Sequence, residues 1–334
     1  MRTVDEVETL TGYDVFSNLP EPYQQCIEAG TNGNNPPLVK GNQTIAFAAP
    51  ANRTYGDAAF TVIATGGASG NLVTFAALGA CTSGGLNGAT ITILSPGLCA
   101  ITASQAGSDI YNAATDVMRT FTIAMATPAF SALSSPTIEV GSASVVIGGT
   151  LTLGALVPTG DVAVTLNGVT VNAPIAANGQ FSATLVTGSL SVANSPYLIS
   201  FAYGGDTNFN GATGSSSLAV VDTTVPTIGA LTATPGVLTP PNHRLVDIVV
   251  GYAATDASGA PVCALTVSSN EPVNRTGDGN TSSDWTIFPL DPHRVQLRAE
   301  RAGTGTGRIY TITATCSDGY GHSTSNSTTV TVPK

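Results

Sequence analysis

Short runs in which apolar and polar residues alternate recur along the whole chain. Clear examples are Thr90–Ile93 (TITI), Val162–Leu166 (VAVTL) and Thr328–Val332 (TTVTV). A period of two sends successive side chains to opposite faces of a β-strand, one face buried and the other in water. Thr, Val and Ile are also the residues that strands favour. The pattern therefore predicts a protein built from many short strands.

The composition agrees with the strand pattern. Of 334 residues, 42% are hydrophobic and only 10% are charged, and there are 37 Gly and 20 Pro. Such a chain is too apolar to be disordered and too rich in turn-forming residues for a helical fold. At this length we expect two or three domains, each large enough for a modest core.

One motif occurs twice. Gly107–Thr115 (GSDIYNAAT) and Gly205–Thr213 (GDTNFNGAT) align without a gap, 98 residues apart, and each is flanked by β-rich runs. That offset is the size of one immunoglobulin-type sandwich. The fold class that we predict is all-β, with tandem immunoglobulin-like β-sandwiches preceded by a short helical segment.

Gly-, Asn- and Pro-rich segments suggest where the modules begin and end. We expect a helical lead-in and linker over residues 1–37, a first module over 38–126, a second over 127–222 and a third over 223–334. The lead-in is acidic, lacks strand alternation and is too small to hold a core of its own.

Three modules resemble known families. In the first, Gln43–Phe47, Arg53–Phe60 and Gly97–Gly107 resemble bacterial Ig-like repeats of large secreted and surface proteins. The second is similar to another Ig-like repeat family of the same proteins, through Val157–Thr165 and Tyr203–Ala212. The third has the pattern of an Ig-like or fibronectin-like module. The resemblance implies a non-catalytic extracellular region that acts as a spacer, presents a neighbouring domain or binds a surface protein or carbohydrate.

The start of the chain carries a different resemblance. Thr3–Pro20 (TVDEVETLTGYDVFSNLP) resembles the closing segment of bacterial DNA/RNA non-specific endonucleases of the ββα-metal class. That resemblance implies the C-terminal tail of a secreted nuclease whose catalytic domain lies upstream. The Asp-Arg-Gly-His motif of that family is absent from the sequence, so no catalytic residue can be assigned from it. The alternative is an ordinary helical appendage.

The charge of the chain limits its partners. There are 21 acidic and 11 basic residues, a net charge of −10, and no basic stripe, so we expect no strong nucleic-acid binding. No apolar run of about 18 residues occurs, which predicts no membrane span. We expect no secretory signal in the opening residues Met1–Glu6, because no apolar core follows them.

Cysteine positions bear on the compartment. Cys81 and Cys99 fall in the first module and Cys263 and Cys316 in the third, which leaves Cys26 over. Disulfides within the two modules would indicate an oxidising compartment, and thus a secreted or cell-surface protein. The alternative is five free thiols in a cytosolic protein, although no Cys-x-x-Cys spacing for a metal or redox site occurs.

Acidic residues in apparent turns are candidates for calcium ligands. Asp109, Asp206, Asp256 and Asp318 lie beside Gly, Asn or Ser, and loops between such modules can hold calcium through oxygen ligands. No Asp-x-Asp-x-Asp-Gly loop is present, and an isolated turn Asp usually bonds its own backbone. We therefore favour turn chemistry and predict no metal ligand.

The remaining candidate residues for ligand or metal binding lie in the third module. Trp285, the only tryptophan, could form a ligand surface with Arg294 and Arg298 by stacking and forked hydrogen bonds. The alternative is a core tryptophan and a solvated strand face for Arg294, Arg298 and Arg301; Arg308 lies in the same module. His243, His293 and His322 lack the short spacing of a zinc site.

No motif of a reaction is found. Gly303–Arg308 (GTGTGR) is rich in glycine but lacks the Gly-Lys-Ser/Thr ending of a phosphate-binding loop, and we predict a hairpin turn there. Gly-x-Ser-x-Gly and His-Glu-x-x-His are absent as well. The sequence therefore predicts no enzyme, no catalytic residue and no cofactor.

Overall fold

The computed structural model describes residues 39–273, 281 and 283–334. The predicted helical lead-in, the endonuclease-like segment and Cys26 lie outside the described residues. Within them the regular structure is β-strand apart from two short 3₁₀ turns, Leu86–Gly88 and Val192–Asn194. The all-β prediction is confirmed. In the described part of the chain, no helix has the length and apolar content that crossing a bilayer requires.

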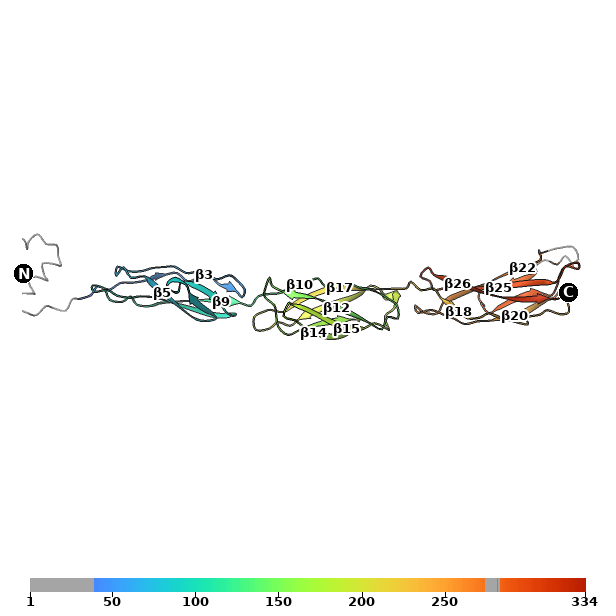
Figure 1. Ribbon diagram of the computed structural model, residues 1–334, viewed down its shortest axis with the longest axis horizontal. Coiled ribbons are helices and arrows are strands. Elements are labelled where there is room, and N and C mark those ends of the chain that lie inside the picture. The colour runs from blue at the N-terminus through green and yellow to red at the C-terminus, as the bar shows by residue number, and fades with distance from the viewer. Residues whose placement is uncertain (1–38, 274–280, 282) are drawn as a thin grey trace, which may run out of the picture. The chain divides into compact units, whose positions relative to one another are not determined.

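The strands form three groups (Figure 1). The first strand group comprises β1 to β9, with sheets in the order β2-β9-β8-β5 and β3-β7-β6 and a separate pair β1-β4. Its strands are β1 Ala46–Phe47, β2 Arg53–Thr54, β3 Phe60–Thr61, β4 Ala64–Thr65, β5 Val73–Gly79, β6 Cys81–Gly84, β7 Thr90–Ile93, β8 Gly97–Gln105 and β9 Val117–Ala124. Its core includes Phe75, Ile91 and Ile101.

The second strand group comprises β10 to β17 and forms two sheets, β10-β12-β15 and β11-β17-β16-β13-β14. The pair β11–β17 is parallel, and the other pairs of this group are antiparallel. Its strands are β10 Ala129–Ser131, β11 Thr137–Glu139, β12 Ser144–Thr152, β13 Asp161–Leu166, β14 Val169–Pro174, β15 Gln180–Val186, β16 Tyr197–Tyr203 and β17 Ala212–Val221.

The third strand group comprises β18 to β26, with sheets β19-β20-β24-β23 and β22-β25-β26 and a pair β18-β21. Its strands are β18 Thr227–Ile228, β19 Thr232–Thr234, β20 Leu245–Gly251, β21 Ala254–Thr255, β22 Val262–Ser269, β23 Trp285–Ile287, β24 Arg294–Arg298, β25 Arg308–Ser317 and β26 Ser323–Val332. Residues 127–206 and 210–334 belong to one compact unit. Among the described residues, no sheet contains strands of two groups.

The alternating runs are strands with one buried face, as predicted. In β13, Val162, Val164 and Leu166 are buried while the residues between them are not. In β26, Val330 and Val332 are fully buried. The Asn87-Gly88 turn has positive φ at both residues, 54° and 73°, which Asn and Gly tolerate best. Alternation and turn chemistry together build each sheet.

Two disulfides lie inside single strand groups. Cys81 is joined to Cys99 and Cys263 to Cys316, at sequence separations of 18 and 53. Cys263 and Cys316 are direct cross-strand partners on β22 and β25. These are the two pairs that the sequence predicts, and the second strand group contains no cysteine.

The predicted hairpin at Gly303–Arg308 is wrong. The strand before this segment, β24, pairs with β20 and β23, whereas β25 after it pairs with β22 and β26. The segment thus passes from one sheet of the sandwich to the other. Glycine-rich chain permits such a crossing as readily as a tight hairpin, so composition alone did not separate the two.

Candidate functional site

The three residues of the predicted ligand surface lie on neighbouring strands. Trp285 on β23 is the cross-strand partner of Leu297, which is fully buried, and it packs against the core of the third strand group. On β24, Arg294 and Arg298 alternate with the buried residues Val295 and Leu297, so they lie on the other face of the strand. Cross-strand partners share a face, and successive residues alternate faces. The structure therefore does not bring Trp285 and the two arginines together on one face.

Each of these side chains has local partners. The Trp285 ring packs edge-on against the Tyr310 ring, with centroids 6.3 Å apart. Arg294 donates to Asp247 Oδ1 at 2.7 Å and lies over the Phe288 ring. Arg298 donates to the carbonyl oxygens of Ser283 and His243. These contacts fit the alternative of a strand face and a core tryptophan.

Arg308, which the sequence placed only among the basic residues of the third module, is completely buried. Its Nη1 donates to Asp284 Oδ2 at 2.5 Å and to Tyr310 Oη at 3.0 Å. Glu300 Oε1 lies 3.5 Å from the same nitrogen, and Glu271 Oε2 lies 3.4 Å from Nε. One guanidinium thus faces three buried carboxyl groups at one end of the third strand group.

Burial shapes the acid–base properties of this charged cluster. Burial raises the pKa of Asp284 to about 6, and the neighbouring Glu300 adds to the effect, while Arg308 opposes it. Burial also raises the pKa of Tyr310 to about 12. Asp284 Oδ1 is buried without a hydrogen-bond partner. Glu300 Oε2 also lies 3.9 Å from Arg298 Nε, so this carboxyl group contacts a second guanidinium besides that of Arg308.

The three histidines have separate surroundings. His243 Nδ1 lies 3.2 Å from Glu300 Oε2, and His293 Nδ1 lies 2.9 Å from the carbonyl oxygen of Val250. His322 Nδ1 lies 2.7 Å from Asp318 Oδ2. The described residues contain no group in which two of these histidines could share one metal ion.

Local turn chemistry accounts for two of the four aspartates predicted in turns, Asp256 and Asp318. Asp256 Oδ1 accepts hydrogen bonds from the backbone and hydroxyl of Ser258, whereas Asp206 Oδ2 accepts them from both groups of Thr159, 47 residues earlier in the chain. Asp318 Oδ1 accepts three backbone N–H groups, those of residues 320, 321 and 322, at 2.6 to 3.1 Å. The fourth, Asp109, is exposed.

One cluster combines a predicted turn residue with one that sequence reasoning missed. Potential ligand atoms of Asp222, Asp318 and His322 all lie within 4.8 Å of one another. Asp222 is in the segment between β17 and β18, and the other two lie at the turn between β25 and β26. Asp222 follows Leu218 and Val220 in the same alternating phase, and all three are buried. This every-second-residue pattern is the feature of the sequence that could have predicted an inward-facing carboxylate at Asp222.

Hydrogen bonds favour ionised carboxylates in this cluster. The Ser258 hydroxyl is the largest influence that lowers the pKa of Asp222, against the opposing effect of burial, and Thr224 adds to it. Burial disfavours ionised Asp318, but its backbone hydrogen bonds and His322 outweigh that effect, so the pKa of Asp318 is lowered. The cluster therefore presents two carboxylates beside an imidazole.

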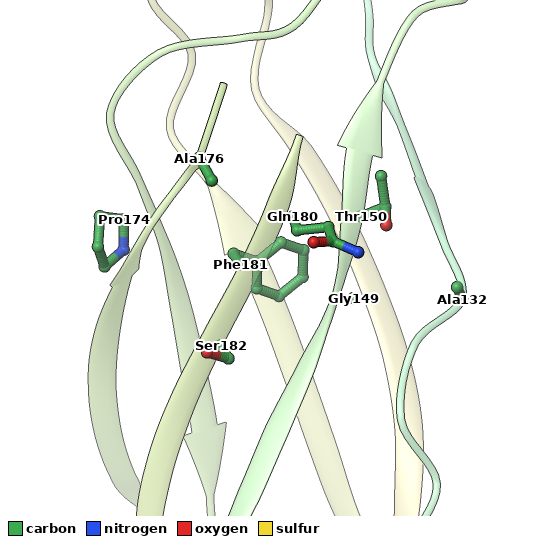
Figure 2. Close-up of a pocket in the computed structure, with 8 residues that line it drawn as sticks. All are labelled: Ala132, Gly149, Thr150, Pro174, Ala176, Gln180, Phe181 and Ser182. Atoms are coloured by element: carbon green, nitrogen blue, oxygen red, sulfur yellow. The ribbon is translucent and has the colours of Figure 1, made fainter. Parts of the chain in front are cut away.

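A surface cavity of about 500 Å³ lies on the second strand group. Figure 2 shows Gln180 and Phe181 on one strand and Thr150 on a neighbouring one. The lining residues are Ala132, Gly149, Thr150, Pro174, Ala176, Gln180, Phe181 and Ser182. None of them titrates, so the cavity offers an amide and two hydroxyls but no acid or base.

Comparison with known proteins gives structural neighbours only. No protein-family model matches the sequence, and no curated protein is significantly similar to it. A mutated variant of three consecutive titin Ig domains is 13% identical over 86% of this chain and 97% of the titin chain, with a TM-score of 0.34. Drosophila N-cadherin EC1-4 is 11% identical over 90% and 74%, with a TM-score of 0.35. The human desmocollin-1 ectodomain is 12% identical over 86% and 61%, with a TM-score of 0.30.

Proposed function

We propose that this chain is a non-catalytic, extracellular region of tandem Ig-like modules, which acts as a spacer that presents a neighbouring domain or as an adhesion-type binding region. The observation that carries the proposal is the closure of each strand group. Each group has its own sheets, and no sheet is shared among the described residues. A sandwich that buries its own core can transmit force without a partner.

The disulfides support the extracellular part of the proposal. Each links strands of a single group. Disulfides persist in oxidising compartments and are rare in reducing ones. The charged side chains of the third group support the non-catalytic part, because Arg294, Arg298 and Arg308 all bond to neighbouring side chains or carbonyl groups. The ligand class under this proposal is a surface protein or a carbohydrate.

Pulling single chains by force spectroscopy tests the spacer. We expect three separate unfolding events, one for each strand group. An extended chain spans about 3.5 Å per residue, so the 53-residue loop closed by Cys263–Cys316 hides about 180 Å and the 18-residue loop of Cys81–Cys99 about 60 Å. A reducing agent should lengthen two events by these amounts and leave the third unchanged. A single cooperative event would refute independent modules.

A nuclease assay tests the non-catalytic assignment. The purified chain should not cleave DNA or RNA with Mg²⁺ or Mn²⁺ present, even at high protein concentration. Its binding to either should be weak and should disappear at modest salt, because few basic groups are available to neutralise phosphates. Metal-dependent cleavage that copurifies with the chain and is lost on substitution of His243, His293 or His322 would overturn the assignment.

A further inference from the structure

The turn between β25 and β26 holds two potential metal ligands in a fixed arrangement. Asp318 Oδ1 accepts three backbone N–H groups, whereas Oδ2 accepts none of them. This oxygen lies 2.7 Å from His322 Nδ1. The Asp318 side chain is fully buried, whereas the His322 side chain is 29% exposed. The turn therefore places a buried carboxylate oxygen beside an imidazole that solvent can reach.

Asp222 supplies an independent observation. The residue is only 8% exposed, and its Oδ1 accepts both the N–H and the hydroxyl of Thr224. Its Oδ2 is buried and has no hydrogen-bond donor. A buried carboxylate oxygen without a well-placed donor is costly, because it has lost the hydrogen bonds of water, even though the Ser258 hydroxyl favours the ionised form of Asp222. An unpaired anionic oxygen within 4.8 Å of Asp318 and His322 calls for a cation.

The groups around the cluster add negative charge and no fixed cation. Ser258 and Asp256, in the segment after β21, both help to lower the pKa of Asp222, so Asp256 is a third carboxyl group beside the cluster. The Ser258 hydroxyl donates to Asp256 Oδ1 at 2.6 Å. No Lys or Arg of the described chain forms an ion pair with Asp222, Asp256 or Asp318. Among the described residues, His322 is the one group paired with these carboxylates that can carry a positive charge. A bound cation would therefore neutralise their negative charge.

We propose that Asp222, Asp318 and His322 form a binding site for a divalent cation. Two carboxylate oxygens with one imidazole nitrogen form a mixed donor set, which suits Zn²⁺ or Mn²⁺. Ca²⁺ and Mg²⁺ prefer sites made of oxygen alone. The cation links the segment after β17 to the turn between β25 and β26, and its binding stabilises the third strand group by mass action.

Titration of the tag-free chain of residues 1–334 with MnCl₂ tests the site. Calorimetry and the electron paramagnetic resonance signal of free Mn²⁺ measure the binding. Mn²⁺ is the better first probe, because the thiol of Cys26 can bind Zn²⁺. Asp222→Asn keeps the oxygen that Thr224 bonds and removes the charge, and His322→Gln removes the imidazole. We expect one bound Mn²⁺ and a dissociation constant raised at least about tenfold in each variant.

Matched substitutions in the same strand group serve as controls. Asp247→Asn alters an exposed carboxylate, and His293→Gln alters a histidine bonded to the Val250 carbonyl, so both should bind as the unaltered chain does. Fluorescence of Trp285 during urea unfolding shows whether a variant is folded. If Asp222→Asn shifts that transition, its Mn²⁺ affinity reflects altered stability as well as the lost ligand. The Mn²⁺ affinity of His322→Gln then tests the site. No saturable Mn²⁺ or Zn²⁺ binding, equal affinity in His322→Gln, or binding of Ca²⁺ alone would overturn the proposal.

Discussion

The second and third strand groups close similar pairs of sheets around different interiors. In the second group, Phe130, Phe181 and Phe201 contact one another with ring centroids 5.8 to 6.1 Å apart, and there is no cysteine. In the third, a buried Arg308 and a disulfide accompany the apolar core. The apolar interior depends on buried area alone, whereas the charged one depends on every partner remaining in place.

This difference predicts that the stability of the two strand groups responds differently to pH, to reduction and to substitution. The three phenylalanines have no titrating group, and the second group has no bond that a reductant breaks. The third group should respond to pH and to the loss of one charged residue at the Arg308 end of β25, and to reduction at the Cys316 end. Trp285 is the only tryptophan and lies in the third group, so its fluorescence reports that group separately within the intact chain.

The largest effect should come from Arg308→Met. The substitution leaves Glu271, Asp284 and Glu300 buried without their guanidinium, and breaking a buried charge network in this way costs about 3–5 kcal/mol. Urea unfolding followed by Trp285 measures the loss. Phe201→Ala in the second group is the control, because it should leave the Trp285 transition unchanged. Equal stability of Arg308→Met and the unaltered chain would show that the charged cluster contributes nothing.

Reduction should separate the groups next. In the chain-entropy model, a closed loop of 53 residues stabilises by about 4 kcal/mol and a loop of 18 residues by about 3 kcal/mol. Reduction should therefore lower the stability of the third and first groups by about these amounts and leave the second unaffected. Hydrogen exchange of the second group's strands, measured with and without reductant, checks this contrast. Faster exchange there on reduction would contradict independent folding.

The pH dependence of the third group should have an unusual sign. Burial raises the pKa of Asp284 to about 6, so between about pH 4 and pH 6 the folded chain holds a proton that the unfolded chain has released. Stability should therefore fall as the pH rises through this window, by about 3 kcal/mol at most. Asp284→Asn should flatten the dependence of the Trp285 transition on pH. A dependence that stays the same in this variant would exclude Asp284 as its source.

Much of the fold was predictable because alternation carries it directly. Val162, Val164 and Leu166 point inward because a strand repeats every two residues. The disulfides were predictable because each pair falls inside one module: Cys81 and Cys99 bracket a hairpin-like stretch, and Cys263 and Cys316 lie in strand-like runs. The crossing at Gly303–Arg308 was not, since strand pairing between distant segments depends on the whole sandwich and glycine-rich composition does not record it.

The candidate sites were harder to predict because they break the polar-outside rule. Arg308 precedes Tyr310 and Ile312 in the buried phase of β25, and Asp222 continues the buried phase of Leu218 and Val220. Because Arg308 and Asp222 are charged residue types, a rule based on residue type places them in solvent. Their positions in the alternation of buried residues along the chain place both in the interior. The partners of Arg308 remained hidden in either case, because Glu271 and Asp284 come from loops without periodicity.

The smallest effect should come from the exposed ion pair of the same group. Arg294 and Asp247 bond at 2.7 Å, but their side chains are 44% and 54% exposed. Water and salt screen such a pair, and holding two long side chains still offsets much of what remains. Asp247→Ala should therefore leave the Trp285 unfolding midpoint within experimental error, at low and at high salt. A shift as large as that of Arg308→Met would mean that burial does not govern the strength of ion pairs in this group.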